Sequence, residues 1–400
     1  MNVVLINPPS LNLRGIPTGI LLLKRYLTEN LNQDVKIDLV DFNDKYFDYY
    51  YLVKKIKTYC RYCNEKKKCV KRDYLPQGIL KLREQIDYCE SIIFKDYLRD
   101  NARNLKNIDQ EVRQLLNSKP SVVGFSVFHS FNNQRAKTSL GQLLFVLAYA
   151  KTIKKLSHNI KIILGGPALY SESQNYEIIR YFTFIDIIVQ GEGELALNSI
   201  IQRIDKQKFQ GIANIIWRDG VKIVKNKKNI IEKSICIFPD YSSYNLDLFK
   251  TFLAKMVEGI LNRQKDNLLL SLTLSKGQFD KEMMLPLKLS YGCPWGRCKF
   301  CTFHKFSAYK FKNEQTLVKE INYYINELRV NTFFIIDDEM SSNMFMRFIK
   351  LIKNNNWNIS YTALARPVKY FTKELLLEIR NSGCRNILWG AETFSRRKLG

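Results

Sequence analysis

The stretch Tyr291-Gly292-Cys293-Pro294-Trp295-Gly296-Arg297-Cys298-Lys299-Phe300-Cys301 says more about fold and chemistry than any other part of this chain. Its three cysteines have the spacing C-x4-C-x2-C and follow a predicted strand at 287–291. Thiolates are the usual ligands of iron–sulfur clusters. Three of them on one loop can hold three irons of a [4Fe–4S] cluster and leave the fourth iron open. Cys293, Cys298 and Cys301 are therefore the candidate metal ligands.

Two other metal sites are compatible with the same loop. A tetrahedral zinc site needs four ligands, and His304, three residues beyond Cys301, would be the fourth. A four-thiolate electron-transfer cluster would need Cys384, the next cysteine along the chain. The close grouping of three cysteines favours the cluster with an open iron over both alternatives.

Strand and helix patterns alternate from residue 285 onward. Such alternation predicts a parallel sheet covered by helices. The expected strands are 287–291, 332–337, 358–364 and 386–391, and the expected helices are 315–328, 342–354 and 373–382.

These features resemble the radical S-adenosylmethionine superfamily, and GCPWGRCKFC (292–301) resembles its branch with an N-terminal cobalamin (B12)-binding domain. The usual family spacing is C-x3-C-x2-C, so this chain has one extra residue between the first two cysteines. The resemblance implies a TIM-like partial (βα)6 barrel. It also implies a cluster that cleaves S-adenosylmethionine reductively to a 5′-deoxyadenosyl radical. Phe300 would pack beside the adenine of that cofactor.

Acids and an arginine stand where three of the expected strands end, at Asp337-Asp338-Glu339, at Arg366 and at Gly390-Ala391-Glu392-Thr393. Active sites of α/β barrels lie at the carboxyl ends of the strands. Taken singly, each could also be a solvated loop acid, an ion-pair partner or a helix cap. The resemblance implies that S-adenosylmethionine is contacted by Asp338, Glu339, Arg366 and Glu392.

An earlier series of strands and helices occupies residues 1–205. A short apolar strand at Val3–Ile6 is followed by the loop Asn7-Pro8-Pro9 and by a helix pattern from Ile20. The series predicts an α/β fold with a doubly wound parallel sheet of Rossmann or flavodoxin-like type. The expected strands are 3–6, 35–40, 121–127, 160–164 and 186–190, and the expected helices are 20–27, 140–156, 176–181 and 194–204.

Residues 1–44 and 116–205 resemble the cobalamin-binding domain of the same enzymes. The matching stretches are INPPS (6–10), VVGFSV (122–127), ILGGP (163–167) and VQGEGE (189–194). Glycines after a strand let the backbone approach a large flat ligand closely. The alternative is a retained sheet that shapes a substrate pocket. The resemblance implies a possible cobalamin site that includes Ser126, Gly165, Gly166, Gly191 and Glu192.

The Asp-x-His-x-x-Gly motif that ligates cobalt from below is absent. The three histidines of the chain, His129, His158 and His304, stand in other contexts. A bound cobalamin would then have no histidine on its lower face. His129 follows the expected strand at 121–127 and is most simply a surface-loop residue.

Residues 45–115 interrupt the first series with helical periods rich in tyrosine, lysine and arginine, which predicts a helical insertion. The pair Cys60-x2-Cys63, with Cys69 and Cys89 further on, could bind zinc or an auxiliary cluster. The second pair is poorly spaced, so ordinary thiols fit better.

Residues 206–284 are expected to connect the two series. Asp219-Gly220 is typical of a hairpin turn. A helix pattern follows near Leu246–Arg263.

The composition, with 46% hydrophobic residues among 400, predicts more than one globular domain. A net charge of +25 is compatible with a nucleic-acid or acidic-peptide partner, but the dispersed lysines also fit solvated surfaces. No signal-peptide pattern and no apolar run of ~18 residues occurs, which predicts a cytoplasmic protein without a membrane span. The expected partners are a small-molecule or peptide substrate and an electron donor such as flavodoxin or ferredoxin.

The second series offers four strands, whereas the family's barrel has six, so we expect a piece of a longer protein whose barrel at 285–400 is truncated. The leading functional hypothesis is a radical S-adenosylmethionine enzyme that methylates or otherwise modifies an unreactive carbon with cobalamin. One alternative is a radical enzyme of the same fold without cobalamin, acting in cyclisation or peptide modification. The other is a basic RNA- or peptide-binding protein with a structural metal knuckle.

Overall fold

The computed structural model describes residues 1–8, 16–42, 108–128, 139–169, 172–229, 237–247, 283–298 and 308–391. The chain divides into two compact units. The first comprises Met1–Leu13 and Gly19–Asn229, and the second comprises Arg14–Thr18 and Ile230–Gly400.

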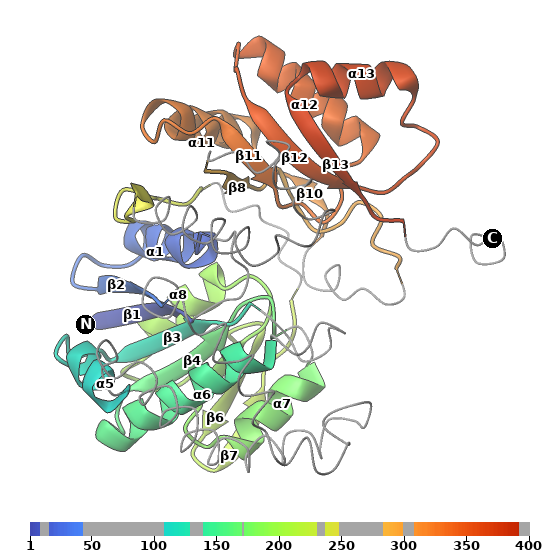
Figure 1. The fold of residues 1–400 in the computed structure, drawn as a ribbon. Coiled ribbons are helices and arrows are strands. Elements are labelled where there is room, and N and C mark those ends of the chain that lie inside the picture. Colours follow the sequence, from blue (N-terminus) through green and yellow to red (C-terminus); the bar gives the residue numbers. More distant parts are fainter. Residues whose placement is uncertain are drawn as a thin grey trace, which may run out of the picture. The chain divides into compact units, whose positions relative to one another are not determined.

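The first unit contains a seven-stranded sheet with the order β2-β1-β3-β4-β5-β6-β7 (Figure 1). The first five strands run parallel, and the last two pair antiparallel at one edge. The order 2-1-3-4-5 is that of flavodoxin-like folds, as the sequence predicts. The strands are β1 Asn2–Asn7, β2 Lys36–Asp41, β3 Val122–Ser126, β4 Lys161–Gly165, β5 Ile187–Val189, β6 Ile215–Asp219 and β7 Lys222–Lys225.

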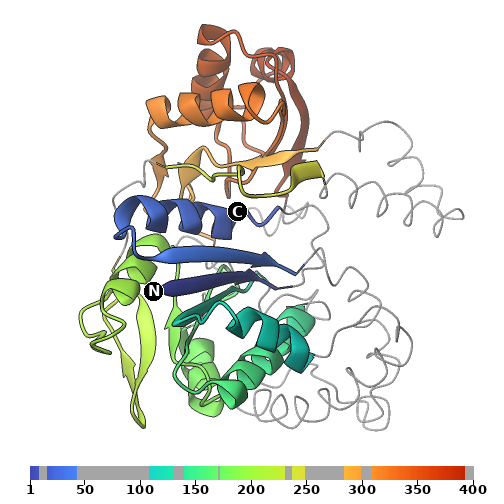
Figure 2. The same cartoon turned by 90° about the vertical axis from the view of Figure 1, so that its left-hand side faces the viewer.

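Helices cover both faces of this sheet (Figures 1 and 2). Successive side chains of a strand point to opposite faces, so Val3 and Leu5 pack into one core and Val4 and Ile6 into the other. All four are at most 2% exposed, as expected for a parallel strand buried on both faces. The helices are α1 Thr18–Asn30, α5 Ile108–Leu116, α6 Ser139–Leu156, α7 Glu172–Tyr181 and α8 Glu194–Gln202.

The hairpin expected within the connector is part of the first sheet. β6 pairs with β5, and β7 pairs with β6 around a turn in which Gly220 has a positive φ of 58°. Ile215, Ile216 and Trp217 are buried, which anchors the hairpin in the core. The first unit accordingly runs to Asn229, beyond the boundary near 205 that the alternating pattern suggests.

Parts of the expected insertion and connector lie outside the described residues. Of the insertion, the structure describes α5. Cys60, Cys63, Cys69 and Cys89 are not among the described residues, nor is most of the helix expected near Leu246–Arg263.

The second unit contains a four-stranded parallel sheet with the order β13-β12-β11-β8. The expected strand at 287–291 is divided in two, because the chain turns after β8 and continues as β9. β9 pairs antiparallel with β10. The elements are β8 Leu285–Leu287, β9 Ser290–Tyr291, β10 Lys310–Phe311, α11 Glu314–Asn326, β11 Thr332–Ile335, α12 Ser342–Asn354, β12 Ser360–Ala365, α13 Lys373–Asn381 and β13 Cys384–Trp389.

Side-chain caps fix where the three helices of this unit begin. Asn313, Ser341 and Thr372 each accept a hydrogen bond from the backbone amide three residues later. Such a cap satisfies one of the four amides that a helix start leaves without partners. The helices therefore begin within one residue of the starts that the sequence predicts.

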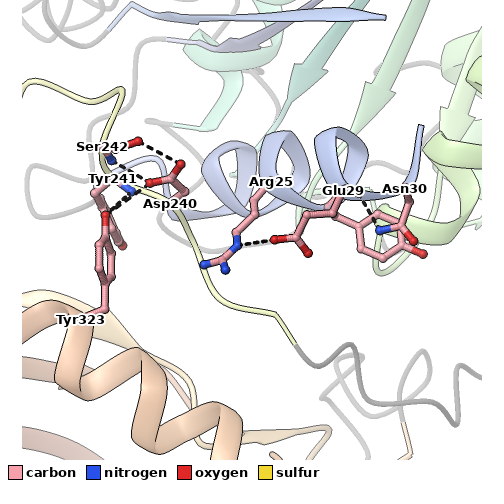
Figure 3. Close-up of polar contacts among 8 residues, drawn as sticks. Arg25, Glu29, Asn30, Asp240, Tyr241, Ser242 and Tyr323 are labelled. Carbon is pink, nitrogen blue, oxygen red and sulfur yellow. Dashed lines mark hydrogen bonds and ion pairs between the residues drawn. The ribbon is translucent and has the colours of Figure 1, made fainter. Parts of the chain in front are cut away.

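A group of tyrosines, in which Tyr241 is buried and Tyr323 half-buried, ties residues 16–18 and 237–241 to α11 within the second unit. Tyr241 Oη lies 3.3 Å from Thr18 Oγ1, and its backbone amide donates to Tyr323 Oη at 3.2 Å. Figure 3 shows Tyr323 beside Asp240 and Tyr241. Burial raises the pKa of Tyr241 far above its ordinary value. The short segment Ile16–Thr18, which we call the strap, thus belongs to the second unit although its neighbours in sequence belong to the first.

Among the helices in the described ranges, none combines the length and the apolar character needed to cross a bilayer.

Candidate functional site

The cysteine loop begins directly after β9. Gly292 and Gly296 have positive φ angles of 65° and 59°, a conformation that favours glycine, and they bend the chain on either side of Cys293. Cys293 and Cys298 are both half-buried and form no disulfide. Cys301 lies outside the described residues, as does Phe300.

The surroundings of Cys293 suit a metal thiolate. Burial raises the pKa of its thiol, the backbone amides of Gly296 and Trp295 lower it, and the charge of Glu339 raises it. The thiol donates to Glu339 Oε2 at 3.8 Å. A bound metal would replace the thiol proton, and the amides of Gly296 and Trp295 would stabilise the thiolate.

Glu339 and Arg366 meet beside Cys293. Arg366 Nε donates to Glu339 Oε1 at 3.3 Å, and Glu339 is 9% exposed. The guanidinium of Arg366 also stacks on the ring of Trp295, 3.8 Å from its centroid. Arg297 stands 5.3 Å from the same ring. The structure therefore brings together Cys293, Glu339 and Arg366, three of the residues that the sequence singles out.

The three acids after β11 have different surroundings. Asp337 is buried and accepts hydrogen bonds from Leu289 N at 2.8 Å, Ser290 N at 2.5 Å and Ser290 Oγ. Burial raises its pKa to about 6, against the lowering effect of those hydrogen bonds. Asp338 is exposed, and its pKa is raised by partial burial. The acid expected to contact a ligand is thus Asp338 or Glu339, whereas Asp337 holds the chain before Cys293.

All these groups lie at one edge of the sheet. The cysteine loop follows β8 and β9, Glu339 follows β11, and Arg366 follows β12 (Figure 1). Gly390, at the end of β13, donates from its backbone amide to Ala365 O at 2.8 Å. Glu392 lies outside the described residues. The carboxyl edge of a parallel sheet is where α/β folds bind ligands.

The described residues hold no preassembled group of three His, Cys, Asp or Glu side chains suited to a metal. Cys293 and Cys298 are two thiols of the expected set, and the third falls outside. The donor chemistry fits an iron–sulfur cluster, because the loop offers thiols together with backbone amides aimed at a sulfur.

In the first unit, the residues expected near cobalamin follow three neighbouring strands. Gly166 has a φ of 103°, and a Cβ there would lie 2.5 Å from the carbonyl oxygen of Val127. This contact is a steric reason for glycine at position 166 that does not depend on a ligand, and the expected role of Gly166 near cobalamin stays a prediction. A Cβ at Gly165 would meet its nearest neighbour, Val189 Cβ, at 4.0 Å. The five expected residues are placed after β3 (Ser126), after β4 (Gly165, Gly166) and after β5 (Gly191, Glu192).

The same edge contains a buried amide that the sequence analysis does not single out. Gln190 follows β5 and is 2% exposed, and its Nε2 has no hydrogen-bond partner within the described ranges. An unsatisfied buried donor is costly unless a ligand or water meets it. The sequence feature that could have pointed to Gln190 is its position within the motif VQGEGE (189–194). His129 lies outside the described residues, and His158 lies at the opposite edge, before β4.

Solved structures with a similar fold are known. The structure of the radical S-adenosylmethionine methyltransferase TsrM from Kitasatospora setae, with cobalamin and a [4Fe–4S] cluster bound, matches 98% of this chain and 60% of its own, with a TM-score of 0.59 and 14% identity. The cobalamin-dependent S-adenosylmethionine radical enzyme OxsB, with aqua-cobalamin and S-adenosylmethionine bound, matches 100% of this chain and 45% of its own, with a TM-score of 0.57 and 16% identity. In its fold, the chain is similar to these two B12-binding radical S-adenosylmethionine enzymes.

The chain is also similar in sequence to curated proteins. An uncharacterized methyltransferase of Pyrococcus horikoshii is 22% identical over 256 residues, covering 62% of this chain and 49% of the relative. An anaerobic magnesium-protoporphyrin IX monomethyl ester cyclase of Rubrivivax gelatinosus is 21% identical over 318 residues, covering 77% and 49%. The chain thus spans about half the length of these relatives. No protein-family model matches it.

Proposed function

We propose that Cys293, Cys298 and Cys301 hold a [4Fe–4S] cluster at which S-adenosylmethionine is cleaved reductively. The observation that supports this most directly is the meeting of Cys293, Glu339 and Arg366 at the carboxyl edge of the second sheet. A zinc knuckle gives no reason for a buried acid and a stacked arginine to converge on its first cysteine.

The cluster and the side chains around the loop have separate roles. When bound, a cluster with an open iron supplies the electron that breaks a carbon–sulfur bond of S-adenosylmethionine and yields a 5′-deoxyadenosyl radical. Glu339 would accept a hydrogen bond from the ligand's amino group, and Arg366 holds the Glu339 carboxylate in place while stacking on Trp295. Asp338, Phe300 and Glu392 complete the expected contacts to the ligand.

For the overall reaction we favour cobalamin-dependent methylation or a related modification of an unreactive carbon. The fold shared with TsrM and the methyltransferase relative support this choice. Cobalamin would lie at the carboxyl edge of the first sheet, near Ser126, Gly165, Gly191 and Glu192. The buried amide of Gln190 is a further donor at that edge.

The cyclase relatives support a second candidate, in which the same radical closes a ring. The Rubrivivax cyclase aligns along 77% of this chain, a longer stretch than the methyltransferase. A product that gains a methyl group would favour the first candidate, and a product that loses two hydrogens and gains a ring would favour the second.

The cluster proposal is tested by anaerobic reconstitution with iron and sulfide, followed by reduction in the presence of S-adenosylmethionine. We expect about four irons per chain for a [4Fe–4S] cluster, and 5′-deoxyadenosine as the product. Cys298→Ala should lose both, whereas Cys384→Ala, which removes a buried thiol at the far end of β13, should keep both. Zinc-loaded, iron-free protein without 5′-deoxyadenosine would contradict the proposal and favour the binding-protein alternative.

The cobalamin proposal needs a separate measurement. Hydroxocobalamin added to the purified protein should co-elute with it and keep a visible spectrum that lacks histidine coordination. Free cobalamin after gel filtration, together with normal 5′-deoxyadenosine formation, would favour the radical enzyme without cobalamin.

A further inference from the structure

The backbone just before Cys293 leaves the second sheet and needs new partners for its amides. The β8–β11 ladder ends where Ile336 N donates to Leu287 O at 3.0 Å. β11 ends at Ile335, so it offers no further carbonyl to Leu289 or Ser290. Ser290 is 1% exposed, and an amide left without a partner at such a buried position is destabilising.

The Asp337 side chain accepts the hydrogen bonds that Leu289 and Ser290 cannot make to β11. Its Oδ2 accepts from Leu289 N, and its Oδ1 accepts from both the amide and the hydroxyl of Ser290. All three partners are donors, and a carboxylate offers acceptors only, so it satisfies them together. A carboxamide would turn an NH2 group toward at least one of them.

Leu289 and Ser290, together with Tyr291, also pair with the chain at the far end of the cysteine loop. Ser290 pairs with Phe311, Tyr291 pairs with Lys310, and Leu289 O accepts from Lys312 N at 2.7 Å. The loop 292–309, which contains all three cysteines, therefore leaves and re-enters the fold at a stem whose first strand is fixed by Asp337.

We propose that Asp337 is a positioning residue for the cluster, setting the direction in which Cys293 leaves the sheet. This inference rests on the proposed function, because it assigns the loop the task of holding a cluster. Asp337 acts through Leu289 and Ser290. Glu339, two residues further on, approaches the Cys293 sulfur directly at 3.8 Å. One short segment after β11 thus controls both the stem and the first ligand of the loop.

The test compares Asp337→Asn with Tyr361→Phe in the reconstituted protein. Tyr361→Phe removes a partly buried hydrogen bond between the Tyr361 and Ser382 hydroxyls at 2.8 Å. This bond lies in the same unit, at the amino end of β12. We expect Asp337→Asn to lose iron to a chelator about tenfold faster, or more, and to change the electron paramagnetic resonance spectrum of the reduced cluster. Tyr361→Phe should match the wild type in both. Ser290→Ala, which removes the hydroxyl donor alone, should shift both readouts less and in the same direction, and it serves if Asp337→Asn does not fold.

Wild-type iron retention and spectrum in Asp337→Asn would overturn the inference, and so would an equal effect of Tyr361→Phe. Hydrogen exchange in metal-free protein tests the hydrogen bonds from Leu289 and Ser290 to Asp337 without the cluster. The amides of Leu289 and Ser290 should exchange faster in Asp337→Asn and at the wild-type rate in Tyr361→Phe, and unchanged exchange in both would also overturn the inference. Wild-type protein that takes up no iron would contradict the proposed function, while the exchange rates would still decide whether Asp337 fixes the stem.

Discussion

Gly166 shows how little room the first unit leaves where β4 ends. Its φ is 103°, and an added Cβ would meet the Val127 backbone at 2.5 Å. Gly166→Ala should therefore lower the free energy of unfolding by about 2 kcal/mol or more, since left-handed strain alone costs about 1–3 kcal/mol. Gly165→Ala is the matched control, because its Cβ would find an ordinary neighbour at 4.0 Å, and it should cost less than about 1 kcal/mol. Urea unfolding of the two variants measures the difference, and equal losses would contradict the steric argument.

At the same scale, the acids after β11 show what a residue pattern predicts and what it leaves open. The sequence places Asp337, Asp338 and Glu339 at the end of a strand beside the cysteine loop, and the structure keeps them there. The sequence does not predict that Asp337 points to Leu289 and Ser290 while Glu339 points to Cys293. Those directions depend on the local path of the backbone after β11, which no residue type specifies.

Among the elements, α11 carries two acids in contrasting surroundings. Glu320 forms an ion pair with Lys312 in which both side chains are at most 4% exposed, and it also accepts from Tyr324 Oη at 2.7 Å. Glu314 pairs with Arg347, and both side chains are nearly half exposed. Breaking a buried pair costs about 3–5 kcal/mol because a charge is left without its partner. An exposed pair is worth about 1 kcal/mol or less.

Glu320→Gln should therefore destabilise the protein several-fold more than Glu314→Gln in the same denaturant titration. Both changes replace a carboxylate by an amide on one helix, so helix propensity is matched. Similar losses in the two variants would mean that the buried pair contributes no more than a surface contact.

Element boundaries were predicted best where a local interaction defines them. The helix starts follow from Asn313, Ser341 and Thr372, whose capping role can be inferred from the sequence. The division of the expected strand at 287–291 depends on Asp337, which is distant in the chain. The attachment of the β6–β7 hairpin to β5 likewise depends on a partner strand, and apolar alternation does not name partners.

For the whole molecule, we expect each proposed cofactor to change the unfolding midpoint of one unit and not that of the other. A ligand that binds the folded form alone adds about 2.7 kcal/mol of stability at a hundred times its dissociation constant. Loading the cluster should therefore raise the unfolding midpoint of the second unit, and cobalamin that of the first. Differential scanning calorimetry of the metal-free, cluster-loaded and cobalamin-loaded forms would measure this. A single transition that shifts equally with either cofactor would contradict it.

The strap can reach its partner only after much of the chain has been synthesised. Thr18 meets Tyr241, which follows it by 223 residues. At about 5–20 residues per second, a ribosome makes the two roughly 10–45 s apart. The sheet of the first unit, complete at β7, is synthesised within that interval, while the strap still awaits its partner. Completing the second unit therefore requires Ile16–Thr18, which are synthesised before the rest of that unit.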